Sequence, residues 1–205
     1  MLDLNAIITG LLQSFGYSAL FAIVFAESGL FFGFFLPGDS LLFTAGLLAS
    51  QGIFNLAIVL IGVALSAILG DQAGYWMGRK YGRGFFNKPG SLFRDPKHIV
   101  QAEEFYQKHG KKTIVLARFV PAVRTFAPIV AGIGEMEYKT FITYNIAGGI
   151  LWTVLFVGLG FGLGKIIPNA GDYLTLLILA IIVLSFIPIG LEYMKSREKT
   201  PYQSK

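Results

Sequence analysis

The sequence predicts an all-α integral membrane protein, and its composition and apolar runs carry that prediction. Of the 205 residues, 54% are hydrophobic and only 14% are charged, whereas a soluble domain usually carries about 25% charged residues. The apolar residues also gather in runs of roughly 20, the length at which a helix crosses the ~30 Å hydrocarbon core of a bilayer. This composition excludes a soluble enzyme and a disordered or fibrous chain.

The apolar runs predict one membrane domain flanked by two short terminal segments. Segment 1–16 is too short to span a bilayer, so we expect it to be interfacial, and segment 192–205 is a basic tail. The membrane domain between them covers 17–191. Its expected elements are, in order, a re-entrant segment at 17–50, a transmembrane helix at 53–78, a hydrophilic loop at 79–112, a re-entrant segment at 113–133, and transmembrane helices at 140–164 and 171–191.

The 79–112 loop is strongly basic, with nine Lys and Arg residues against three acidic residues. Cytoplasmic loops carry the excess of Lys and Arg, so we expect this loop and the C-terminal tail to be cytoplasmic. Asp95-Pro96 is typical of a helix start and Gly110 of a helix end. The segment between them is predicted to be either an amphipathic helix on the lipid headgroups or a solvated linker helix.

The charge rule also limits how many of the following segments cross the membrane. Three apolar segments separate the basic loop from the basic tail, and three crossings would put the tail outside. Segment 113–133 contains Arg118, Pro121, Arg124 and Pro128, which make it a poor continuous helix. We therefore expect this segment to enter and leave on the cytoplasmic side as a re-entrant hairpin.

The first half of the chain has the same plan. Segment 17–50 is interrupted at Pro37 and Gly38, and its second arm is too short to cross. This predicts a hairpin entering from outside; the alternative is a full first span with a cytoplasmic N-terminus. An offset of 84 residues aligns Pro37 with Pro121. Two opposed hairpins, each followed by a full helix, form an inverted-topology repeat, as in many transporters with a site near the midplane.

Four ionisable residues lie inside the two broken segments: Glu27, Asp39, Arg118 and Arg124. An isolated charge at the bilayer centre costs about 2.5–3.5 kcal/mol on insertion scales, so these residues must pair, face water or bind a charged ligand. The arginines suit a bidentate clamp on phosphate, and the carboxylates are candidates to take up and release protons. A simpler alternative is buried salt bridges that only hold the hairpins together.

Asp71, in the helix that follows the first hairpin, is a candidate accessory residue. It would pair with an arginine, cap a hairpin or reach the membrane surface.

The residue inventory argues against catalysis. The chain has no cysteine, and both histidines, His98 and His109, lie in the hydrophilic loop. The sequence contains no His-Glu-x-x-His motif and no Gly-x-Ser-x-Gly-like turn. We therefore expect no catalytic residue, no metal site and no cofactor.

Three motifs, in this order along the chain, resemble the DedA family, also called the SNARE-associated or VTT-domain group. They are Glu27 followed by Phe-Leu-Pro-Gly-Asp-Ser-Leu-Leu at 35–42, then Gly70-Asp71-x-x-Gly-Tyr-x-x-Gly-Arg, then Arg118-Phe-x-Pro-x-x-Arg124-Thr. The resemblance covers roughly residues 15–190, nearly the whole chain.

This resemblance implies a multi-pass protein of the bacterial cytoplasmic membrane with two opposed re-entrant hairpins. The family is associated with movement of lipids across the bilayer, with a dependence on the proton motive force. Its essential acidic pair falls on Glu27 and Asp39, and its essential arginines fall on Arg118 and Arg124.

We therefore expect a flippase that moves undecaprenyl phosphate or a related phospholipid, is coupled to the proton motive force and supports envelope homeostasis. Its expected partners are membrane lipids and protons rather than nucleic acid, and a homodimer is one option for its assembly. Two other functions stay open. One is a proton-coupled exporter of small cations or drugs, in which the acidic pair binds the substrate. The other is a membrane organiser that transports nothing.

Overall fold

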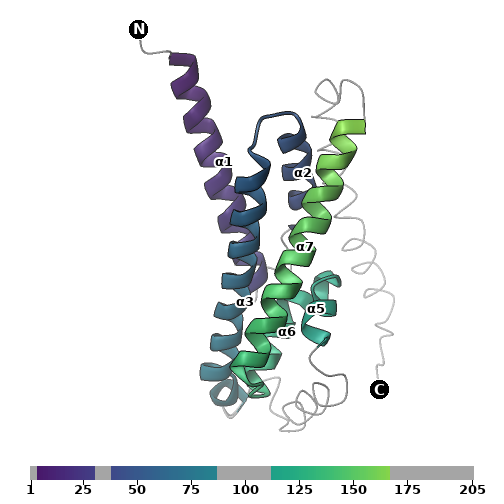
Figure 1. The fold of residues 1–205 in the computed structure, drawn as a ribbon. Helices are drawn as coiled ribbons and strands as arrows, with labels where there is room; N and C mark the ends of the chain where they lie inside the picture. Colours follow the sequence, from purple (N-terminus) through teal and green to yellow (C-terminus); the bar gives the residue numbers. More distant parts are fainter. Residues whose placement is uncertain (1–3, 31–37, 87–111, 167–205) are drawn as a thin grey trace, which may run out of the picture.

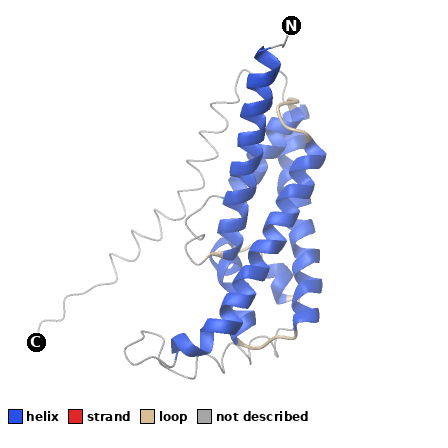
Figure 2. Cartoon of the chain, turned by 90° about the vertical axis from the view of Figure 1, so that its left-hand side faces the viewer, coloured by secondary structure: helices blue, strands red, loops and turns tan. Residues whose placement is uncertain are grey.

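A computed structural model describes residues 4–30, 38–86 and 112–166, and every element in these ranges is an α-helix. The helices are α1 (Leu4–Gly29), α2 (Gly38–Ser50), α3 (Leu56–Phe86), α5 (Thr113–Ala117), α6 (Pro121–Ile133) and α7 (Tyr138–Ile166). Figures 1 and 2 show them side by side in one elongated bundle, with α3 and α7 running in opposite directions. The predicted all-α class is confirmed.

Two of the described helices, α3 and α7, are long and apolar enough to cross a membrane. The qualifying stretches are Leu56–Tyr81 and Tyr138–Ile166, of 26 and 29 residues. Each is about 40 Å long at 1.5 Å per residue and therefore exceeds the hydrocarbon core. One side of α3 exposes large apolar side chains at three- and four-residue spacing: Ile58, Ile61, Leu65 and Leu69. Such a stripe is suited to contact with lipid chains.

The helix α1 is longer than the sequence predicts. It runs without a break from Leu4 to Gly29, across the expected boundary at residue 16. The beginning of α3 supports it at this point, because the Tyr17 ring lies 4.7 Å from the Phe54 ring and the Asn55 N–H donates to the Tyr17 hydroxyl at 2.6 Å. These contacts support α1 at residue 17, directly after the position where the interfacial segment was expected to end.

The helix α3 also extends past the expected end of its span at residue 78, to Phe86. The whole of the predicted surface helix between Asp95 and Gly110, the span at 171–191 and the tail at 192–205 lie outside the described residues.

Helix boundaries coincide with two of the expected breaks. The second hairpin segment is interrupted between α5 and α6, where Val120 is extended (φ −116°, ψ 104°) and Pro121 begins α6. Proline disfavours helix at the residue before it and is tolerated in the first turn. In the first segment, α2 begins at Gly38, while Pro37 lies outside the described residues.

The sequence also predicts a helix break at Pro128, and this prediction is wrong, because α6 continues through Pro128 to Ile133. Proline removes one hydrogen bond from a helix interior. Membrane helices tolerate this loss when neighbouring groups satisfy the freed carbonyl. The helix α6 also packs closely along α3, which holds its path on both sides of the proline.

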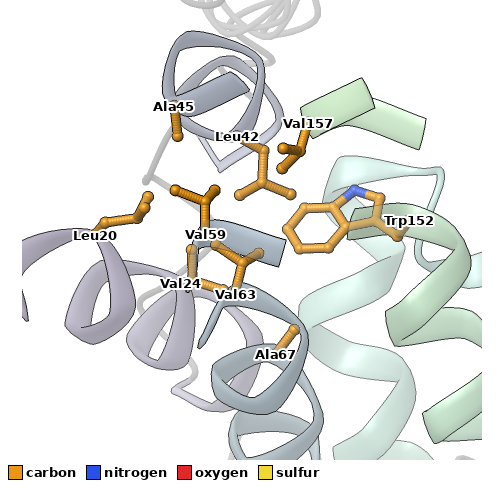
Figure 3. Packing of buried hydrophobic residues seen from close by; sticks show 9 residues of the cluster. All are labelled: Leu20, Val24, Leu42, Ala45, Val59, Val63, Ala67, Trp152 and Val157. Carbon is orange, nitrogen blue, oxygen red and sulfur yellow. The ribbon is translucent and has the colours of Figure 1, made fainter. Parts of the chain in front are cut away.

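A buried apolar cluster joins α1, α2, α3 and α7. Its members are Leu20, Val24, Leu42, Ala45, Val59, Val63, Ala67, Trp152 and Val157. Figure 3 shows Trp152 at the edge of this cluster, beside Leu42. The cluster thereby fixes the start of α2 against the middle of α7.

The short helices α2 and α6 pack on the long helices through glycines. A Cβ atom at Gly46 would overlap the carbonyl of Val157, and a Cβ atom at Gly132 would overlap the carbonyl of Tyr75. Small residues allow this close backbone approach between membrane helices. As a result, α2 lies along α7, and α6 lies along α3 (Figure 1).

These two contacts occupy corresponding positions in the two halves of the chain. Gly46 corresponds to Gly132 with a shift of 86 residues, and Tyr75 corresponds to Val157 with a shift of 82 residues. A second pair of contacts shows the same two shifts: Ile129 with Gly78, and Phe43 with Gly160. The single offset of 84 read from the sequence is therefore the mean of two helix-specific offsets.

We expect Gly46→Ala to lower the free energy of unfolding, because its new methyl group meets the α7 backbone. Overpacking of this kind costs about 1–3 kcal/mol, and thermal unfolding of the purified protein in detergent would measure it. Gly158→Ala is the matched control, because no atom lies within 4 Å of a Cβ built there. Equal stability losses in both variants would contradict the close α2–α7 packing.

Candidate functional site

The candidate residues meet at the middle of the two long helices. Asp71 is the central residue of α3, with 15 residues on either side, and Trp152 is the central residue of α7, with 14 on either side. The end of α1 reaches this level, because Gly29 packs against the backbone of Gly70. The start of α2 and the break between α5 and α6 lie there too, through contacts with Trp152 and Asp71.

Arg124 pairs with both acidic residues that the sequence singles out. Its Nη1 donates to Oδ1 of Asp39, and its Nη2 donates to Oε1 of Glu27. These three residues lie near the end of α1 and in the first turns of α2 and α6, so the pairing joins the two broken segments. The side chains of Glu27 and Arg124 are 2% and 8% exposed, whereas that of Asp39 is 28% exposed. Asp39 is thus the more accessible acid.

Two further donors bind the same carboxylate oxygens. The indole Nε1 of Trp152 donates to Oδ1 of Asp39 at 2.8 Å, and the backbone N–H of Gly38 donates to Oε1 of Glu27 at 3.1 Å. The Trp152 ring centroid also lies 5.1 Å from Cζ of Arg124, within cation–π range. Trp152 is missed by sequence reasoning because a tryptophan in a membrane helix usually serves packing or interface contacts.

Arg118 lies in a separate cluster. Its Nη2 donates to Oδ2 of Asp71 and to Oδ1 of Asn145, and Nδ2 of Asn145 donates to the carbonyl of Ile68 at 3.1 Å. The glycine at 148 leaves room for the arginine, since a Cβ there would lie 3.0 Å from Cδ of Arg118. Of the three roles expected for Asp71, the structure shows pairing with an arginine. Asn145 gives no sequence signal beyond being polar in an apolar span.

If the two opposed hairpins meet near the midplane, as the sequence predicts, their four ionisable residues are expected to converge there; the structure divides them between two clusters. Arg124 meets the acidic pair, whereas Arg118 meets Asp71. The division arises because Arg118 precedes the break at Val120 and faces α7 and α3, while Arg124 follows the break on α6.

The two clusters differ in formal charge. Arg118 and Asp71 form a neutral pair, whereas Arg124 with Glu27 and Asp39 carries one excess negative charge when all three are ionised. Buried charge is unfavourable unless it is paired and hydrogen-bonded. In the described part of the chain, Oε2 of Glu27 and Nε of Arg124 are buried without a hydrogen-bond partner, as is Nε of Arg118 in the neutral cluster, so the excess charge is what distinguishes the two clusters. The Arg124 cluster is therefore the one suited to exchange a proton or bind an ion.

The excess negative charge of the Arg124 cluster does not by itself make a metal site. Within 4–30, 38–86 and 112–166, no group of three or more acidic or histidine residues is placed to hold a metal ion.

Comparison with known proteins agrees with the family resemblance seen in the sequence motifs. The family model of the VTT domain matches residues 36–162. Protein DedA of Escherichia coli strain K12 is 45% identical over 183 residues, which cover 88% of this chain and 83% of the relative. An uncharacterized membrane protein of Mycobacterium leprae is 42% identical over 170 residues, covering 83% and 76%. The E. coli inner membrane protein YqjA is 35% identical over 150 residues, covering 73% and 68%. No solved structure matches the chain.

Proposed function

The chain belongs to the VTT-domain, or DedA, family of membrane proteins, and on that premise we propose that it moves a phosphate-headed lipid across the bacterial cytoplasmic membrane. Undecaprenyl phosphate, or a related phospholipid, is the substrate, and its return to the cytoplasmic leaflet is coupled to proton entry. The observation that carries this proposal is the position of Arg124, which is buried at the level of the helix midpoints with two carboxylates on its guanidinium fork.

The proposed topology has two re-entrant hairpins that meet at the bilayer midplane. One consists of α1 and α2 and enters from outside; the other consists of α5 and α6 and enters from the cytoplasm. The paired contacts of α2 with α7 and of α6 with α3 support this inverted repeat, because they recur at corresponding positions. Broken helices belong around a site or cavity inside the protein, where their free backbone groups find partners.

The guanidinium of Arg124 is the proposed phosphate ligand. Its two parallel N–H arms match two oxygens of a phosphate group as well as they match carboxylates. Protonation of Glu27 and Asp39 removes their charge and weakens their hold on the arginine. A singly ionised phosphate then balances Arg124, so that the loaded site has no net charge at the bilayer centre, where a net charge is costly.

The direction of transport follows from the side to which the acidic pair opens. Glu27 and Asp39 belong to the hairpin proposed to enter from outside, where protons are more abundant under a normal gradient. Arg118 has a supporting role, because its neutral pair with Asp71 attaches the second hairpin to the middle of α3.

The two rival functions use these residues differently. A cation exporter needs free carboxylates for its substrate, but both Glu27 and Asp39 already bind a guanidinium here. A membrane organiser needs no ion-binding group in the bilayer centre at all. Once both carboxyls are protonated, the excess charge of the Arg124 cluster is positive, and this protonated form favours an anionic substrate.

The test is transbilayer movement in liposomes that contain the purified protein. Fluorescent undecaprenyl phosphate and phosphatidylethanolamine would be followed separately, with and without a pH gradient. We expect undecaprenyl phosphate to move, and to move faster with protons in excess on the outer side. Equal movement of both lipids without a gradient would indicate a scramblase instead. No movement of either lipid by folded protein would contradict the proposal and favour the rivals.

A further inference from the structure

We propose that Trp152 and the backbone N–H of Gly38 bind the phosphate group together with Arg124, in place of the two carboxylate oxygens that they now hold. This inference rests on the proposed transport of a phosphate-headed lipid and names the other ligands of the same site.

The hydrogen bonds around the acidic pair form a regular pattern. Oδ1 of Asp39 accepts from Nη1 of Arg124 and from Nε1 of Trp152. Oε1 of Glu27 accepts from Nη2 of Arg124 and from the N–H of Gly38. Each arm of the guanidinium fork thus shares one anionic oxygen with one further donor. Four donors converge on two oxygen positions.

The two oxygens come from different carboxylates and accept from the two Nη atoms of one guanidinium. Two oxygens of one phosphate group use the same kind of donor pair in a bidentate arginine complex. When the carboxyls are protonated and move away, the four donors are left facing two empty acceptor positions. Buried donors without acceptors are costly, so an anion with two adjacent oxygens is favoured there.

The Gly38 N–H is available because it begins a helix. Gly38 is the first residue of α2, a helix of 13 residues, and the first N–H groups of a helix have no partner within it. The positive end of the helix dipole adds to the attraction for an anion. A Cβ at position 38 would overlap the Glu27 carboxylate, so glycine is the residue that lets an anionic oxygen reach this N–H.

Unpartnered polar atoms give independent support for a ligand at this point. Nε of Arg124, which could donate to an anion, and Oε2 of Glu27, which could take up a proton, have no hydrogen-bond partner among the described residues, although these side chains are only 8% and 2% exposed. Groups this deeply buried are nearly always hydrogen-bonded. Described protein groups alone therefore leave the hydrogen-bonding capacity of the site unfilled.

Trp152 is suited to bind an anion because of its chemistry and its packing. The indole N–H donates and cannot accept, so it can bind either carboxylate or phosphate oxygen. The side chain is 1% exposed and packs within the apolar cluster of α1, α2, α3 and α7. Its N–H direction is thereby fixed before the substrate arrives, which lowers the entropy that binding must remove.

The experiment compares Trp152→Phe with the unmodified protein in nanodiscs. The variant keeps an aromatic ring under Arg124 and removes the N–H. We expect the Kd for undecaprenyl phosphate to rise about tenfold or more, as for loss of a hydrogen bond to a charged group. Binding of the uncharged alcohol undecaprenol should be unchanged. Trp76→Phe is the matched control, because Trp76 is the chain's other tryptophan and is 51% exposed.

Each other outcome has a defined meaning. An unchanged Kd for undecaprenyl phosphate in Trp152→Phe would overturn the role of Trp152 but leave the proposed function standing. If the unmodified protein bound undecaprenyl phosphate no more tightly than undecaprenol, the proposed function itself would fail. Inorganic phosphate serves as a competitor, and competition at the same concentration as the lipid would assign the site to free phosphate and overturn a lipid site.

A second measurement does not depend on the folding of Trp152→Phe. In the Trp76→Phe variant, Trp152 is the sole tryptophan, so its fluorescence reports on the indole environment directly. We expect undecaprenyl phosphate, but not undecaprenol, to shift its emission when the N–H exchanges a carboxylate for a phosphate. The same emission with both lipids would overturn the proposal.

Discussion

Arg124→Gln is expected to reduce the rate of undecaprenyl phosphate movement at least about a hundredfold. The change removes the two charge-assisted hydrogen bonds that Arg124 would donate to the phosphate, each worth about 1.5–3 kcal/mol, and each 1.4 kcal/mol is a factor of ten. The rate would be measured in liposomes with equal amounts of folded protein, verified by size-exclusion chromatography.

Arg124→Lys tests the shape of the cation separately from its charge. An ammonium group is a compact point charge without the planar fork of arginine, so it cannot place two fixed arms on oxygens from α1 and α2. We expect this variant to remain about ten- to a hundredfold slower than the unmodified protein, as for loss of a hydrogen bond to a charged group.

Arg79→Gln is the control for both variants, because it removes an exposed arginine of α3 that donates to the Tyr75 hydroxyl. Arg124→Gln with an unmodified transport rate would show that the guanidinium plays no part in transport.

The sequence predicts the broad plan of the molecule because that plan follows from composition and from the cost of buried charge. The long apolar helices α3 and α7 follow from the length of their apolar runs. The pairing of Arg124 with Glu27 and Asp39 agrees with the expectation that charges inside apolar segments find partners. Neither conclusion needs the relative rotation or translation of any two helices.

Details that depend on helix placement could not be predicted in this way. Arg118 meets Asp71 because α5 lies close against Gly148 on α7, and a sequence pattern does not contain that distance. Pro128 interrupts the sequence pattern expected of a helix, but α6 remains helical through it, because α6 packs along α3.

Trp152 and Asn145 contribute hydrogen bonds to the two charged clusters, but in the sequence they resemble ordinary residues of an apolar helix. Trp152 is the central residue of its helix, a position that could have signalled a contact with a midplane site. The expected span at 140–164 has the same central residue, so the sequence contained this signal.

The second large effect concerns the neutral pair of Arg118 and Asp71. We expect Asp71→Asn to lower the free energy of unfolding by about 3–5 kcal/mol, because it leaves a buried arginine without its counter-charge. The Arg118 and Asp71 side chains are 4% and 5% exposed, so water cannot replace the lost partner. Denaturation of the purified protein in detergent would measure the loss. Glu137→Gln, at an exposed acid that accepts from the Thr140 hydroxyl, should change stability by less than about 0.5 kcal/mol.

The double variant Asp71→Leu with Arg118→Met separates a supporting role from phosphate binding. Replacing a whole buried ion pair by apolar residues of similar volume is often neutral or stabilising, so we expect the double variant to regain most of the stability that Asp71→Asn loses. If Arg118 only attaches the second hairpin to α3, the double variant should also move undecaprenyl phosphate at a substantial fraction of the unmodified rate. A double variant that is stably folded and inactive would instead return Arg118 to the phosphate clamp that the sequence predicts, beside Arg124. Because stability and transport are measured on the same preparation, a folding defect and a lost ligand cannot be confused.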